Sequence, residues 1–428
     1  MNTFKLISSS SMILGVSYIL RFALTFVLAR FLQPEQLGVY SWSVTVFGIA
    51  VIFTNFGLDF FLIRKIPEYR NTIESMVGSV INHTKKQVKI NTLLVISIIL
   101  PISYFSTYFF EGASKYNLEL MVILLALPFS AYLLIFSTSL RSFDFPLTGQ
   151  FIDSILQTGI LCLLIFFSFT VFSGSISKDG GTLQLVSLFV CSWILSYFIG
   201  SFFFKKNIKI QGNLEYSKKD TKAWRTDSFT IMIGVLGWSL LGRSDVFLLG
   251  FLVAPSEIGA YFICIRLAEI LLFFSSVSYF IWAGEISNLY QENNLEQTQK
   301  LLKKSSRLCF ISTLILMCLG FNFAEEILFF MNENYVDDVF IFRIALFVFF
   351  IVGSAGMLNP MFYILGQQKF LAKLQWIIGL IFVVLIFLAV PIYGIKGCII
   401  VFAICKGFYI MTLGVRLKTK HNLSILPI

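Results

Sequence analysis

Twelve apolar segments, each about as long as a bilayer is thick, constrain this chain more than any other feature. A helix needs about 20 mostly apolar residues to cross the hydrocarbon core of a membrane. Such segments lie at residues 8–31, 39–63, 88–109, 118–140, 148–172, 182–204, 228–252, 257–282, 307–330, 339–364, 372–391 and 395–415. Only 13% of the residues are charged, against roughly a quarter in a soluble domain. The sequence therefore predicts an all-α integral membrane protein with twelve transmembrane helices.

A repeat in the sequence predicts how these helices are organised. The stretch Leu28–Tyr40 aligns without a gap on Leu249–Tyr261, so that a proline, a glycine and a tyrosine coincide. We therefore expect two pseudo-symmetric six-helix lobes, at residues 1–204 and 227–428, joined by a cytoplasmic linker at 205–226. In membranes this architecture is typical of transporters, which bind their substrate between the repeats.

The positive charges predict the orientation. Loops rich in lysine and arginine stay in the cytoplasm, and here they alternate with loops that carry few such residues. We expect both termini and residues 64–89, 205–225 and 284–307 on the cytoplasmic side. This asymmetry explains most of the net charge of +10, so no nucleic-acid partner is needed. The N-terminal residues run directly into the first apolar segment, and we expect no cleavable signal.

Two polar stretches on the predicted cytoplasmic side are expected to form surface helices. One is a short helix near Trp224, in the linker. The other is Glu285–Arg307, which combines leucines with Glu, Gln and Lys in an amphipathic pattern.

Four cations lie well inside apolar segments: Arg21, Arg243, Arg266 and Lys406. Each costs about 2.5–3.5 kcal/mol at the bilayer centre, so they should face the bundle interior or a wet cavity as substrate-binding residues. In the alignment of the two repeat copies, Arg21 coincides with Gly242, the residue before Arg243. Two guanidinium groups at similar depth suit a pyrophosphate, whose oxygens they bind bidentately. The alternative is internal pairing, which the three-residue spacing of Arg266 and Glu269 favours for that arginine.

Four carboxylates lie within or beside the predicted spans: Asp59, Asp153, Asp245 and Glu269. A carboxyl group in a cavity of low dielectric can couple transport to a proton or sodium gradient. The same groups could instead compensate the charge of the arginines. Both interpretations stay open at this point.

Other functional residues are few. Trp193 and Trp238 could stack on sugar faces, although packing is the favoured interpretation in a chain with 49 phenylalanines. The seven cysteines all lie in apolar segments and the two histidines in polar ones, without metal-ligand spacing. No catalytic motif is present. We therefore expect no enzyme activity, no metal and no cofactor.

Two stretches carry a resemblance to a known family. Residues 29–69 combine Ala29 and Arg30, a Pro-acidic-x-x-Gly-x-Tyr turn and a Gly-Leu pair before a basic helix end. Leu365–Gly407 combines a basic inner loop with a Pro-x-Tyr-Gly-x-x-Gly turn that starts at Pro391. In their order and spacing these motifs resemble the polysaccharide-flippase branch (Wzx-like, O-antigen type) of the multidrug/oligosaccharidyl-lipid/polysaccharide exporter superfamily.

The resemblance implies a flippase in the bacterial inner (plasma) membrane. It would move undecaprenyl-pyrophosphate-linked oligosaccharide units, such as O-antigen repeats, by alternating access. A polysaccharide polymerase and a chain-length regulator would be its partners. Two alternatives stay open. An ion-coupled drug exporter of the same superfamily would need an acidic cavity for cationic substrates, and a membrane polysaccharide polymerase would need a long outer loop where this sequence has short ones.

Overall fold

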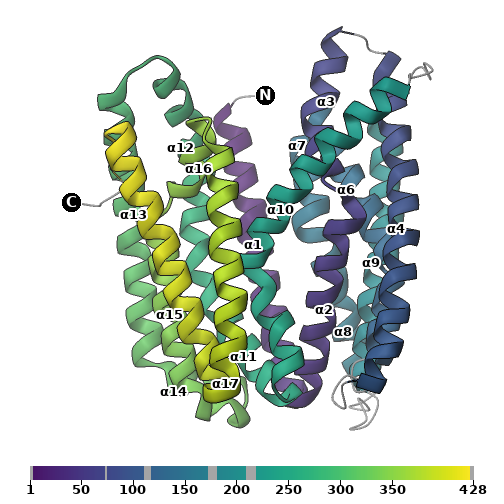
Figure 1. Cartoon of the computed structure of the whole chain (residues 1–428), viewed down its shortest axis with the longest axis vertical. Coiled ribbons are helices and arrows are strands. Elements are labelled where there is room, and N and C mark those ends of the chain that lie inside the picture. Colours follow the sequence, from purple (N-terminus) through teal and green to yellow (C-terminus); the bar gives the residue numbers. More distant parts are fainter. Residues whose placement is uncertain (1–2, 73–74, 110–116, 172–180, 209–217, 425–428) are drawn as a thin grey trace. The chain divides into compact units, whose positions relative to one another are not determined.

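The computed structural model describes residues 3–72, 75–109, 117–171, 181–208 and 218–424. Within these ranges the chain contains helices and no strand, which confirms the all-α prediction (Figure 1). The elements are α1 (Thr3–Phe31), α2 (Pro34–Asn55), α3 (Leu58–Thr72), α4 (Ser75–Phe109), α5 (Asn117–Leu124), α6 (Leu127–Ser142), α7 (Pro146–Phe151), η2 (Ile152–Leu156), α8 (Gln157–Val171), α9 (Gly181–Asn207), α10 (Lys218–Leu252), α11 (Pro255–Ala268), η3 (Glu269–Leu271), α12 (Leu272–Gln291), α13 (Leu295–Asn322), α14 (Ala324–Met331), η4 (Glu333–Asp338), α15 (Val339–Ser354), α16 (Leu358–Ile364) and α17 (Gln368–His421).

Ten helical stretches in the described ranges are long and apolar enough to cross a membrane, and the bent pair α5–α6 makes eleven if it is counted as one span. α17 contains the last two predicted segments, joined at Gly394 with φ 59° and ψ −148°. Gln375 and Tyr409 are hydrogen-bonded at 3.1 Å, and the rings of Phe382 and Phe402 lie 6.0 Å apart. The two arms of α17 therefore run antiparallel, and we interpret them as two crossings.

Contacts between residues divide the chain into two compact units. Unit 1 comprises Met1–Gly38 and Gly237–Ile428, and unit 2 comprises Val39–Leu236. α1 thus packs against α11, α12 and α14 of unit 1. α10 contributes residues 218–236 to unit 2 and 237–252 to unit 1. Residues 209–217 of the predicted linker lie outside the described residues, and the lobe boundaries remain a prediction.

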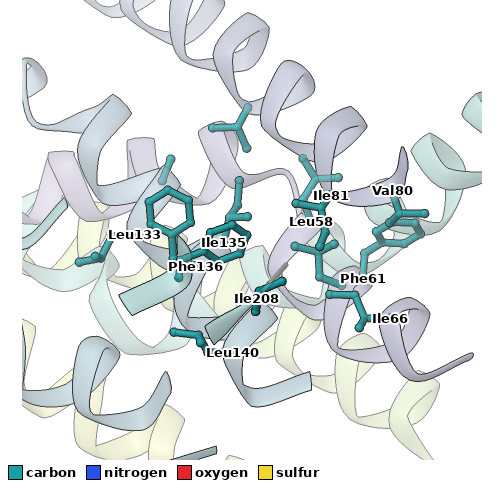
Figure 2. Close-up of a cluster of buried hydrophobic side chains, with 14 of the residues drawn as sticks. Leu58, Phe61, Ile66, Val80, Ile81, Leu133, Ile135, Phe136, Leu140 and Ile208 are labelled. Carbon is teal, nitrogen blue, oxygen red and sulfur yellow. The ribbon is translucent and has the colours of Figure 1, made fainter. Parts of the chain in front are cut away.

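The core of unit 2 is a cluster of buried apolar side chains, most of them from α3, α4 and α6 (Figure 2), with further members from η2, α9, α10 and Ile208. Phe61 and Phe136 are 0% and 4% exposed. Lipid tails are as apolar as these side chains, so helices in a membrane associate through close packing that small residues permit. A β-carbon at Gly200 of α9 would overlap a leucine side chain of α6. Gly200 therefore leaves room on α9 for this leucine side chain.

A kink separates α2 from α3. Phe56 and Gly57 both have left-handed backbones, with φ of 52° and 72°. A β-carbon at Gly57 would also lie 2.5 Å from the carbonyl oxygen of Ser228 in α10, so only glycine allows this approach. α3 therefore starts as a new helix with Asp59 in its first turn.

In unit 1, the first turn of α2 meets the first turn of α11. Both helices begin with proline, and each carries a glycine four residues later. A β-carbon at Gly38 would overlap the carbonyl oxygen of Pro255, and one at Gly259 would overlap that of Pro34. The repeated motif thus packs backbone to backbone against its own counterpart, which explains why glycine occupies both positions.

Candidate functional site

Four cationic side chains from four helices gather in unit 1: Arg21 of α1, Arg243 of α10, Arg266 of α11 and Lys406 in the second arm of α17. Arg266, Glu269 and Arg21 act electrostatically on the Arg243 guanidinium. Asp245 and Glu269 act in the same way on the Lys406 ammonium. We call these four cations and two carboxylates the charged cluster. It unites all the substrate-binding candidates predicted from the sequence.

Arg243 and Asp245 have different surroundings although only one residue separates them on α10. Each residue turns an α-helix by about 100°, so side chains two apart point in nearly opposite directions. Asp245 is 3% exposed, and its carboxylate accepts hydrogen bonds from the Tyr261 hydroxyl at 2.9 Å and the Val246 backbone N–H at 2.8 Å. Arg243 is exposed. Within the described part of the chain, no carboxylate forms an ion pair with Arg243.

Arg266 and Glu269 form an ion pair within the charged cluster. Arg266 Nη1 donates to Glu269 Oε2 at 2.7 Å across a three-residue spacing. The guanidinium also lies over the Phe262 ring, 4.9 Å from its centroid. Glu269 therefore neutralises Arg266 and leaves the charges of Arg21 and Arg243 without a directly bound carboxylate among the described residues.

Lys406 lies against aromatic rings. Its Nζ atom is 5.3 Å from the Phe402 centroid and 5.8 Å from the Trp238 centroid. Cation–π attraction holds an ammonium in such a position. Trp238 is 50% exposed, so its indole has a free surface beside the ammonium group.

The charge balance of the charged cluster is positive. Its cations exceed its carboxylates by two. A β-carbon added at Gly242 or Gly407, which are next in sequence to Arg243 and Lys406, would meet no atom within 4 Å. An accessible group of cations with this excess can bind an anion that presents several oxygens.

The remaining ion-coupling candidates, Asp59 and Asp153, belong to unit 2. Arg141 of α6 forms an ion pair with Asp153 at 2.5 Å, and both residues act electrostatically on Asp59. Asp153 lies in η2, a π-helical turn, and such turns are frequent at functional sites. In this group two carboxylates share one cation. No three His, Cys, Asp or Glu side chains in the described ranges are placed to hold a metal ion.

A comparison with protein families shows to which family the chain is related. The family model described as "Polysaccharide biosynthesis protein" matches residues 4–280. The chain belongs to this family. The match includes Arg21, Arg243 and Arg266, whereas Lys406 follows it. No curated protein matches the chain.

Solved structures share the fold over 96% of this chain. An inward-facing multidrug resistance MATE family transporter of the MOP superfamily has a TM-score of 0.74, with 14% identity and 99% of its own length covered. The lipid II flippase MurJ, inward closed, has a TM-score of 0.71, with 15% identity and 87% covered. A MOP superfamily transporter from Pyrococcus furiosus, described by a reverse polarity of its binding pocket, has a TM-score of 0.62, with 13% identity and 94% covered. At these identities the likeness shows that the chain has the fold of these proteins, and together with the apolar helices it makes the chain a multi-pass membrane protein.

Two aromatic residues contact the charged cluster although the sequence does not predict them there. Tyr261 holds Asp245, and the repeat contains a signal for it because Tyr261 aligns with Tyr40. The sequence favours packing for Trp238, yet this residue lies beside Lys406. Trp193, by contrast, packs in unit 2 with the ring of Phe189 at 6.2 Å. The position of an aromatic residue relative to a cation on another helix has no signal in a single sequence.

Proposed function

We propose that this protein is a flippase for undecaprenyl-pyrophosphate-linked oligosaccharide units, such as O-antigen repeats, and that it moves them across the inner membrane by alternating access. The family membership supports a role in polysaccharide biosynthesis. A lipid II flippase with the same fold shows that this architecture can serve a lipid-linked substrate. The observation that carries the proposal is the excess of two positive charges in the charged cluster.

The chemistry of the cluster fits a pyrophosphate. A guanidinium presents its donors as a planar fork that binds two phosphate oxygens at once. Arg21 and Arg243 have this geometry and no ion-pair partner among the described residues, so in our proposal they hold the pyrophosphate together. Lys406 adds a point charge, and the exposed face of Trp238 offers a stacking surface for a sugar ring. The polyprenyl tail stays in lipid while the headgroup crosses.

The carboxylates have a second role in this proposal. Asp245 and Glu269 adjoin the cations, so protonation or ion binding there would change the charge that the substrate meets. Asp59 and Asp153 form a separate candidate pair for ion coupling in unit 2.

A drug exporter of the same superfamily is the second candidate, because a multidrug transporter shares the fold. Its cationic substrates would meet a cluster with excess positive charge, which repels them. A polymerase is the third candidate, and neither the repeat nor the fold of the solved neighbours supports it. The polymerase and the chain-length regulator instead enter our proposal as partners that take over the translocated units.

Deletion of the gene tests the function directly. We expect lipid-linked repeat units to accumulate on the cytoplasmic face and the surface polymer to disappear, with unchanged susceptibility to cationic drugs. A surface polymer of normal amount and length, in a strain without another flippase, would refute the proposal. Single repeat units at the surface would favour the polymerase.

The orientation is part of the same proposal, with both termini and the lysine-rich ends of α4 and α9 in the cytoplasm. A cysteine placed at Asn334, in η4, should react with a membrane-impermeant reagent from outside. A cysteine at Lys206 should not. Ser175 and Asn213, in the loops that give the sharpest contrast by sequence, lie outside the described residues. Outside labelling at position 206 would overturn the orientation.

A further inference from the structure

Unit 2 contains a pocket of about 380 Å³ that the proposed transport function does not use. α4, α6 and α9 form it. Two lysines, Lys85 and Lys205, and four aromatic residues, Tyr132, Phe136, Tyr197 and Phe204, line most of its wall. It shares no residue with the charged cluster or with the group of Arg141, Asp59 and Asp153.

The two lysines bring like charges to one wall. Lys205 acts electrostatically on the Lys85 ammonium, and neither lysine forms an ion pair within the described ranges. Lys85 Nζ lies 4.6 Å from the Phe204 centroid and 5.6 Å from that of Phe136. Cation–π attraction holds this ammonium in place without neutralising it. A bound anion would relieve the repulsion between the two lysines.

Only one of the two tyrosines in the pocket has a hydroxyl group that is available to donate a hydrogen bond to an anion. The Tyr132 hydroxyl donates its proton to the backbone carbonyl of Lys85 at 3.2 Å, so it has no proton left for a ligand. The Tyr197 hydroxyl makes no such bond in the described structure and can donate into the pocket. Two ammonium groups and one hydroxyl form a donor set that suits phosphate oxygens.

The position of the pocket indicates where its ligand comes from. On α9, Phe198 and Phe202 lie next to the lining residues and are 62% and 61% exposed. On α4, Leu93 lies two turns beyond Lys85 and is 62% exposed. Apolar side chains exposed to this extent belong against lipid in a membrane protein. The pocket therefore lies where the apolar faces of α4 and α9 change to lysine-rich ends, which is the level of lipid headgroups.

We propose that this pocket binds the phosphodiester headgroup of an anionic phospholipid from the leaflet at the lysine-rich ends of α4 and α9. The phosphate lies between Lys85 and Lys205 and accepts a hydrogen bond from the Tyr197 hydroxyl. The aromatic wall packs against the glycerol and the first part of the acyl chains. Basic pockets between membrane helices bind anionic headgroups in this way. The proposal is independent of what the protein transports.

Native mass spectrometry of the purified full-length protein tests this proposal. The probes are phosphatidylglycerol, phosphatidylcholine and inorganic phosphate, each titrated in detergent. We expect wild-type protein to retain phosphatidylglycerol in preference to phosphatidylcholine, and the variant Lys85→Gln/Lys205→Gln to bind it at least tenfold more weakly. The matched control is Lys86→Gln/Lys206→Gln, which removes the same charge from exposed neighbours on the same helices and should bind as wild type does.

Three outcomes would overturn the proposal. Equal loss in both double variants would mean a diffuse surface potential, and no loss in either would mean that the pocket is not the site. Displacement of phosphatidylglycerol by an equal concentration of inorganic phosphate would assign the pocket to a free anion. If Lys85→Gln/Lys205→Gln fails to fold, the single change at the exposed Lys205 should still weaken binding about threefold relative to Lys206→Gln. Lys85→Arg/Lys205→Arg should retain the lipid.

Discussion

In the charged cluster of unit 1 four cations share two carboxylates, whereas in the unit 2 group one cation, Arg141, is shared by the two carboxylates Asp59 and Asp153. The backbone of the repeat does not show this difference, since the prolines and glycines that begin α2 and α11 are the same in both copies. The charges of the unit 2 group are not repeated, because Asp59 aligns with Phe280 at the offset that aligns the two copies. The repeat therefore preserves how helices approach one another, while each copy carries its own charges.

The largest expected effect comes from removing Arg21 and Arg243, the two arginines of the charged cluster that have no ion-pair partner in the described structure. Arg21→Gln and Arg243→Gln should each lower surface polymer, and the double variant should abolish it, because glutamine keeps the approximate length but not the charge. Lysine at either position should rescue only in part, since it lacks the planar fork. Surface polymer is measured at matched protein levels.

The control for these variants is Arg30→Gln, in the last turn of the same helix as Arg21, which should support full polymer. Full polymer in both Arg21→Gln and Arg243→Gln at low expression would contradict the proposal. The anion site would then have to be rebuilt around Arg266 and Lys406.

Two glycines allow a tightly packed position of unit 2 to be compared with an open position of unit 1. Gly57→Ala should lower the free energy of unfolding by about 1–3 kcal/mol, because alanine is strained at a φ of 72° and would approach the Ser228 carbonyl. Gly242→Ala should cost nothing, since its β-carbon meets open space. Thermal unfolding in detergent measures both. Equal destabilisation by the two changes would contradict the open surroundings of Gly242.

The ion pair in unit 2 should make a smaller contribution. The Arg141 and Asp153 side chains are 32% and 35% exposed, so screening limits the pair to about 1 kcal/mol. Asp153→Asn should lower stability by about this amount, and Arg141→Gln in the same protein should restore part of it, as a double-mutant cycle measures. If Asp153→Asn instead keeps stability but abolishes transport, Asp153 serves ion coupling and the unit 2 group is functional.

The smallest effect concerns the aromatic residue beside Lys406. Trp238→Ala should weaken substrate binding about two- to fivefold, because an exposed cation–π contact contributes about 0.5–1 kcal/mol. Trp238→Phe should retain most of the affinity. The matched control is Trp193→Phe, a tryptophan that packs in unit 2. Titration of a lipid-linked pyrophosphate onto purified protein measures the affinities, and an unchanged Trp238→Ala would exclude this ring from the site.

Apolar length predicts the helices well, but it does not predict where they break. The segment 39–63 kinks because Phe56 adopts a left-handed backbone, which its residue type disfavours. The amphipathic helix expected over Glu285–Arg307 is interrupted after α12. There Asn293 is left-handed, with φ 57°, and the Asn294 side chain accepts the Gln297 N–H at 3.2 Å as the cap of α13. Such local side-chain bonds compete with helix continuation.

Part of the predicted polar linker is helical and packed, although its polar residues predict a surface segment. α10 already begins at Lys218, and Trp224, which we expected on a short surface helix, is 2% exposed. Its indole N–H donates to the Tyr69 hydroxyl at 3.1 Å, and its ring contacts that of His83 at 5.2 Å. The apolar helix therefore extends into the predicted linker because unit 2 offers this tryptophan a buried partner.

The sequence predicts which charged residues belong to the candidate site, but not most of the contacts between them. The energetic cost of charges inside apolar segments is enough to select Arg21, Arg243, Arg266 and Lys406 from the amino-acid sequence. Helical spacing suggests the Arg266–Glu269 pair, which the structure forms. The hydrogen bond from Tyr261 to Asp245 joins two helices, as does the contact of Trp238 with Lys406. Such contacts depend on how helices pack, which a single sequence does not contain.

The most direct measurement of the central claim is binding of a short-chain polyprenyl pyrophosphate to purified wild-type protein and to Arg21→Gln/Arg243→Gln. The account predicts that the double variant binds at least tenfold more weakly, and that the wild type prefers the pyrophosphate to the corresponding uncharged polyprenol. Arg30→Gln should bind as wild type does. Equal affinity of the double variant and the wild type, with both proteins folded, would contradict the claim that the excess positive charge of unit 1 holds the pyrophosphate.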